Sequence, residues 1–151
     1  MPLMINVLAA SANTGVDRVL MKTWRISLKQ GVVFVKFEDG AVTGAGTFME
    51  ISRELHSNPE KYRSSNLVLD LRNIVPGPDT GFESLQTMVQ QFKATRQAGL
   101  AHKKTALVVA GKLAFGLSRI YASLVEDSLD YQVNVFEDDL QAAIAWAAYP
   151  D

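Results

Sequence analysis

Residues 66–82 read NLVLDLRNIVPGPDTGF, and this stretch decides the fold. Its apolar run from Leu67 to Leu71 has polar residues before it and a Pro-Gly-Pro turn after it. Such a short run is typical of a strand that is covered on both faces. We therefore predict a strand near the middle of a sheet, then a loop, then a helix that begins near Gly81. Open α/β sheets usually place their sites in such loops, at the carboxyl ends of strands.

Size and composition limit the class of protein. The chain has 151 residues, of which 48% are hydrophobic, which is enough for the core of one domain. A formal net charge of -1 lacks the basic excess typical of nucleic-acid binding, so we expect no nucleic-acid partner. The chain has no cysteine, which excludes disulfides and thiolate metal sites and fits a cytoplasmic protein.

The start of the chain is apolar. Residues 1–10 lack a basic leader and are too short to span a bilayer, so we expect no membrane insertion. We predict that residues 1–21 form an N-terminal arm or an extra strand, and that residues 22–151 form a single domain. An apolar segment that the core does not need also makes a homodimer a secondary expectation.

The patterns in the rest of the chain predict an α/β fold. Apolar and polar residues alternate over 24–28, and 32–37 runs back after a turn, so these segments are expected to form an antiparallel hairpin. From residue 66 the order is strand, helix, strand, helix, strand, helix, and right-handed crossovers make these strands parallel. The further predicted strands are 105–110 and 131–136, and the predicted helices are 44–56, 81–98, one after 112 and one capped by Asp138 or Asp139.

Two local patterns mark the start of predicted helices. Thr47 and Glu50 have capping-box spacing, which would move the start of the first helix to a later residue. Thr80 and Glu83 repeat that spacing, and the loss of such a cap typically costs about 1 kcal/mol. The alternative for Thr80 is a switch, because a phosphate there would add roughly -1.5 to -2 charges at a helix N-terminus.

Motifs for catalysis or metal binding are weak. The two histidines, His56 and His102, are most simply solvated, so we expect no metal, no cofactor and no enzyme. Lys112 lacks the neighbours of a P-loop lysine, but it stands at a strand-to-helix turn where backbone N–H groups favour an anion. A titratable cluster is offered only by Asp70, Arg72 and Asp79. Asp70 has a simpler explanation as a buried strand residue that hydrogen-bonds to a nearby turn.

Several stretches resemble one known family. The segments LVLDL at 67–71 and DTGF at 79–82 resemble the signature stretch of the STAS domain of anti-sigma factor antagonists such as SpoIIAA. The second half is similar to the SpoIIAA-like (STAS-like) group in the segments LAFGLSR at 113–119, VNVFED at 133–138 and AAIAW at 142–146. The likeness covers about 24–146. It implies a mixed four- to five-stranded sheet, with an N-terminal antiparallel hairpin and helices packed on it.

The resemblance also implies a function. In SpoIIAA-type antagonists, a partner kinase phosphorylates a serine before the glycine of this loop, and the matching residue here is Thr80. We therefore expect a non-enzymatic binding or regulatory domain that contacts a protein or a small ligand. The STAS-like group also resembles the CRAL-TRIO fold, so the alternative is a carrier of a lipid or other apolar small molecule. The candidate binding or regulatory residues are Asp70, Arg72, Asp79, Thr80, Gly81 and Lys112.

Overall fold

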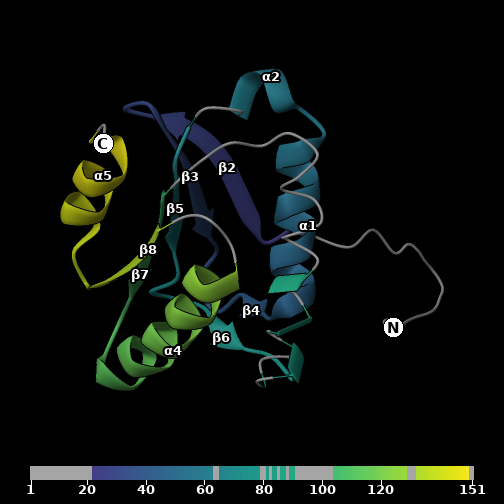
Figure 1. The fold of residues 1–151 in the computed structure, drawn as a ribbon, viewed down its shortest axis with the longest axis vertical. Coiled ribbons are helices and arrows are strands. Elements are labelled where there is room, and N and C mark those ends of the chain that lie inside the picture. The colour runs from purple at the N-terminus through teal and green to yellow at the C-terminus, as the bar shows by residue number, and fades with distance from the viewer. Residues whose placement is uncertain are drawn as a thin grey trace, which may run out of the picture.

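A computed structural model describes residues 22–62, 65–78, 81, 83–84, 86–87, 89–90, 104–128 and 132–149. Within these ranges, one five-stranded sheet has the order β2-β3-β5-β7-β8 (Figure 1). β2 and β3 are antiparallel, and the pairs β5–β7 and β7–β8 are parallel, as predicted. β3 and β5 are also parallel, which the sequence did not predict. The strands are β2 (Trp24–Lys29), β3 (Val32–Phe37), β5 (Leu67–Asp70), β7 (Lys104–Val109) and β8 (Gln132–Glu137).

The hairpin between β2 and β3 closes through a two-residue loop. Gln30 and Gly31 both have positive φ angles, of 54° and 81°. Two such residues form the tight turn that matches the twist of an antiparallel pair. Gln30 has a Cβ in this left-handed conformation, which costs roughly 1–2 kcal/mol. The predicted hairpin is thus confirmed, and β2 extends to Lys29, one residue beyond the predicted end at 28.

Burial explains the strand order. Every residue of β5 and β7 is buried, which fits their places as interior strands of the sheet, with β5 at its centre. β8 alternates between buried and more exposed residues, as expected for an edge strand. One core lies between the sheet and the helices α1 (Ala45–His56) and α4 (Lys112–Ser128). The other lies under α5 (Leu140–Ala148), on the opposite face of the sheet (Figure 1).

The helix starts test the predicted caps. Asp139 caps α5, since its carboxylate accepts a hydrogen bond from the Ala142 N–H at 3.0 Å. The later start expected for the first helix is wrong: α1 begins at Ala45, and the Thr47 hydroxyl accepts from the Gly44 N–H at 3.2 Å. Thr47 therefore lies inside the helix and satisfies the backbone before it. The short helix α2 (Pro59–Tyr62) follows α1, and residues 83–84, 86–87 and 89–90 are helical within the predicted 81–98.

A second, two-stranded sheet was not predicted. β4 (Val42–Thr43) pairs in parallel with β6 (Val75–Pro76). The backbone N–H of Val75 donates to the Ala41 carbonyl, and that of Gly77 donates to the Thr43 carbonyl, both at 2.7 Å. These bonds tie the loop after β5 to the segment that leads into α1. The Pro-Gly-Pro stretch is therefore a paired strand end rather than a simple turn.

Candidate functional site

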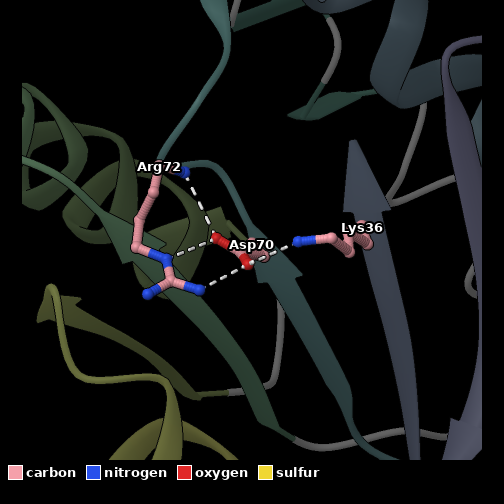
Figure 2. Close-up of polar contacts among 3 residues, drawn as sticks. All are labelled: Lys36, Asp70 and Arg72. Atoms are coloured by element: carbon pink, nitrogen blue, oxygen red, sulfur yellow. Dashed lines mark hydrogen bonds and ion pairs between the residues drawn. The ribbon is translucent and has the colours of Figure 1, made fainter. Parts of the chain in front are cut away.

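The carboxyl end of β5 carries a compact ion pair, Asp70 with Arg72 (Figure 2). Arg72 Nε donates to Asp70 Oδ1 at 2.9 Å, and the terminal Nη2 donates to Oδ2 at 2.8 Å. The Arg72 backbone N–H also donates to Oδ1, at 3.3 Å. Both carboxylate oxygens are thus engaged in the two-pronged geometry that a guanidinium fork favours. Asp70 therefore does bond to the turn that follows it, and both predicted residues lie together.

Charge keeps this carboxyl group ionised. Burial alone would raise the pKa of Asp70, but the hydrogen bonds and the charge of Arg72, and then the charge of Lys36, bring that pKa below its ordinary 3.8. The hydrogen bond to Asp70 in turn raises the pKa of Arg72. A carboxylate whose pKa is lowered and whose two oxygens already accept hydrogen bonds is a poor general acid or base near neutral pH.

Lys36 is a third member of this cluster that the sequence prediction missed. It lies on β3 directly beside Asp70, and its Nζ is 3.9 Å from Asp70 Oδ2 (Figure 2). Lys36 is exposed, whereas Asp70 is buried and Arg72 is partly buried. A charged residue among apolar neighbours in the 32–37 run was the available signal. Parallel pairing of β3 with β5, which the sequence prediction did not state, is what brings it to Asp70.

The fold has a counterpart among solved structures. A crystal structure of an uncharacterized protein of the DUF3478 family, with a SpoIIAA-like fold, from Shewanella loihica PV-4, matches with a TM-score of 0.51. The match covers 82% of this chain and 91% of that chain, at 14% sequence identity. The chain has a SpoIIAA-like fold. No protein-family model matches the sequence, and no curated protein does.

Two of the other candidate residues, Lys112 and Gly81, belong to the described part of the SpoIIAA-like chain. Lys112 is the exposed first residue of α4, just after β7. Gly81 is exposed, and a Cβ built on it would meet nothing within 4 Å, so its role as glycine is not steric. Asp79 and Thr80 lie outside the described residues, and so whether Thr80 caps a helix stays a prediction.

The described residues hold few groups for metal chemistry. No group of three or more His, Cys, Asp or Glu side chains that could hold a metal ion occurs among them. His56 is partly buried at the end of α1, where its Nδ1 is 2.8 Å from the Ser52 carbonyl oxygen, so it is less solvated than predicted. His102 lies outside the described ranges. None of the helices in those ranges is long and apolar enough to cross a membrane.

A second polar cluster lies at the amino end of the SpoIIAA-like sheet. Lys104 is buried and is the first residue of β7, one residue before the start of the predicted strand 105–110. Its ammonium donates to the carbonyls of Trp146 at 3.2 Å and Tyr149 at 2.8 Å, at the end of α5. The Asn66 amide donates to the Ala147 carbonyl and accepts from the Lys104 N–H. These contacts join α5 to two central strands.

Proposed function

We propose that this chain is a non-enzymatic binding domain and that a partner protein contacts the carboxyl end of its sheet. The observation that carries the proposal is the exposed apolar pair Val42 and Val75. These residues are opposite each other in the β4–β6 ladder, and 61% and 46% of their surfaces are exposed. The two valines form a small exposed apolar patch on a hydrogen-bonded ladder, and exposed apolar patches with polar surroundings are a feature of contact surfaces.

The charges near this pair support binding rather than catalysis. Asp70 and Arg72 neutralise each other through two hydrogen bonds, so neither is prepared to accept or release a proton at neutral pH. Arg72 keeps 29% of its side chain exposed, which leaves part of the guanidinium available to a partner. The loop after β5 thus carries both a partly exposed arginine and an exposed apolar residue, Val75, and interfaces combine these two kinds of residue in their core and rim.

Regulation by phosphate at Thr80 is the finer part of the proposal. It rests on the resemblance of the loop to that of SpoIIAA-type antagonists and on the exposure of the nearby Pro78 and Gly81. A phosphate at the start of a helix would be favoured by the helix dipole and would change the charge that a partner meets.

Site-specific photocrosslinking tests the contact surface. A photoreactive amino acid placed at Val75 should give a discrete protein adduct in host cells. The matched control is Tyr149, which is 71% exposed at the opposite end of the sheet and should give no such adduct. Equal adducts at both positions, or none at Val75, would contradict the proposal.

Native mass spectrometry of the protein from its own host tests the regulation. One phosphate that maps to Thr80 and disappears in Thr80→Val, but not in Thr87→Val, would support the switch. Thr87 is the matched control because it is an exposed threonine in the helical stretch that follows. A non-covalent apolar adduct with Thr80 unmodified would instead identify the carrier that the CRAL-TRIO resemblance leaves open.

A further inference from the structure

A row of cations lies on the face of the sheet that carries α5, beyond the part that α5 covers. That helix packs on β3, β5, β7 and β8. On β2, side chains alternate between the two faces, and Arg25, Ser27 and Lys29 share the face of α5. All three residues are exposed. This surface, Arg25, Ser27, Lys29 and the neighbouring Lys36, is called the cationic strip below.

The strip contains an unfavourable pair. Arg25 on β2 lies directly opposite Lys36 on β3, so their side chains leave the same face of the sheet side by side. Like charges at such positions destabilise a sheet. Among the described residues, Arg25 has no carboxylate within salt-bridge distance. The carboxylate nearest to Lys36 is that of Asp70, which Arg72 already neutralises at a shorter distance. Positive charge therefore remains in excess here.

Two neighbouring residues define the limits of the strip. Lys29 Nζ lies 5.1 Å from the ring centroid of Phe34, which holds this ammonium over the sheet at the hairpin end. Glu38, just after β3, is the nearest acid along the strand and is exposed. Arg25 and Lys29 are four positions apart, which is about 13 Å along a strand. An extended segment with an acidic residue at every second position would match this spacing.

Protection of an open sheet edge is the simplest alternative explanation. Charged side chains on an edge strand prevent edge-to-edge association, and β2 is an edge strand. That role accounts for Arg25 and Lys29. It does not account for Lys36, because β3 is paired on both sides and has no open edge. Lys36 does have the Asp70 carboxylate 3.9 Å away, but Arg72 binds that carboxylate at 2.8 Å, so Arg25 and Lys36 together leave a positive charge that an anionic partner would offset.

We propose that the cationic strip is a docking surface for an acidic segment of a partner protein. Charge complementarity favours this occupant, because the strip offers exposed cations at strand spacing and lies on a sheet face that no helix of the described chain covers at β2. The surface is separate from Val42 and Val75, so the proposal goes beyond the proposed function. Crosslinking at Val75 can succeed or fail without affecting it.

Fluorescence anisotropy with a labelled peptide of alternating Glu and Ser tests the strip. The full-length protein should bind this peptide at low salt, and a Gln/Ser peptide should bind far more weakly. Arg25→Gln with Lys36→Gln should weaken binding by about fivefold or more, and added salt should weaken it in the wild type. The matched control is Lys61→Gln with Arg119→Gln, two exposed cations on other elements, which should stay within about twofold of the wild type.

Stability separates docking from a structural role. The double variant should keep the thermal midpoint, because losing the repulsion between Arg25 and Lys36 offsets losing the 3.9 Å ion pair of Lys36 with Asp70. Arg25→Glu should raise the midpoint, because it keeps that ion pair and places a carboxylate opposite Lys36, and it should still abolish peptide binding. Equal loss of binding in the control pair would overturn the proposal, as would binding to phosphatidylserine vesicles but not to the peptide. A self-association that Arg25→Gln with Lys36→Gln removes would also overturn it, since the occupant would then be a second copy.

Discussion

The two ends of the parallel strands each bury one charged group, but they satisfy it in different ways. At the amino end, the Lys104 ammonium is held by two backbone carbonyls of the last helix. At the carboxyl end, the Asp70 carboxylate is held mainly by the side chain of Arg72, which comes from a loop. Lys104 and Asp70 are almost equally buried, at 4% and 5% exposed.

The choice of partner decides what each end can do. Backbone carbonyls at a helix terminus cannot change rotamer, and a cation there also interacts well with the helix dipole. The Lys104 cluster is therefore closed and serves to attach α5. The guanidinium of Arg72, which lies on a loop, can rotate and bind a different anion. Asp70 would then keep only its longer ion pair with Lys36. We therefore expect the amino end to provide stability, and we propose that the charged group at the carboxyl end can exchange partners.

The largest expected effect is at the amino end. Lys104→Met should lower the free energy of unfolding by about 3 kcal/mol, because it leaves two carbonyls without their donor in a buried place. Lys112→Met is the matched control, since Lys112 is exposed at the other end, and it should change stability by less than about 0.5 kcal/mol. Chemical denaturation measures both. A loss below about 1 kcal/mol for Lys104→Met would remove the distinction between the two ends.

A smaller effect is expected at the carboxyl end. Arg72→Met should cost about 2 kcal/mol, less than a fully buried pair, because Arg72 is partly exposed and Lys36 remains near Asp70. In a double-mutant cycle with Asp70→Asn, the second substitution should recover part of that loss. If Arg72→Met lowered the free energy of unfolding by more than Lys104→Met, the carboxyl end would contribute more to stability than the amino end.

The pH dependence of stability tests the contribution of the Asp70 carboxylate at the carboxyl end. The pKa of Asp70 is lower in the folded chain than its ordinary 3.8, so the ionised carboxylate contributes stability above that value. This contribution is lost as the pH falls below about 3.8 and through the folded pKa. Asp70→Asn should therefore flatten the stability profile below pH 4 and destabilise the protein at neutral pH. If the stability of Asp70→Asn fell with decreasing pH as it does in the wild type, ionisation of Asp70 would not contribute to the stability of the fold.

The smallest expected effect is a gain at the amino end. The Thr105 hydroxyl is buried and has no hydrogen-bond partner among the described residues. Thr105→Val keeps the shape of the side chain and removes the unsatisfied group, so it should raise stability by about 1 kcal/mol. Thermal unfolding measures the change, and Thr43→Val, at another buried threonine, is the comparison. A loss of stability in Thr105→Val would show that the hydroxyl has a partner in solution.

The sequence predicted the sheet well, because periodicity reports burial. The apolar run at 67–71 and the alternation near 131–136 correspond to a central strand and an edge strand, and the hairpin was also predictable. Asp70 and Arg72 were identified together because they are two residues apart. Contacts between residues far apart in the chain were not predictable in this way. The ion pair of Lys36 with Asp70 forms because β3 and β5 are neighbours in the sheet. The hydrogen bond from Lys104 to the Tyr149 carbonyl forms because the end of α5 lies beside the start of β7.

Short paired segments were hidden for another reason. Val42–Thr43 and Val75–Pro76 are too short to show any period, and proline is a poor signal for a strand. The fold was therefore predictable, whereas the exposed apolar pair on which the proposed function rests was not. Asp79 and Thr80 stay predictions, since they lie outside the described residues.

The pairing of β4 with β6 has a mechanical consequence. The hydrogen bonds from Val75 and Gly77 end on Ala41 and Thr43, and α1 begins two residues after Thr43. The loop after β5 is therefore connected by hydrogen bonds to the segment just before α1. That helix has twelve residues and is about 18 Å long. Its far end lies at His56, beside the turn into α2. A partner bound to the loop, as proposed above, would therefore contact a segment that is hydrogen-bonded to the residues just before α1.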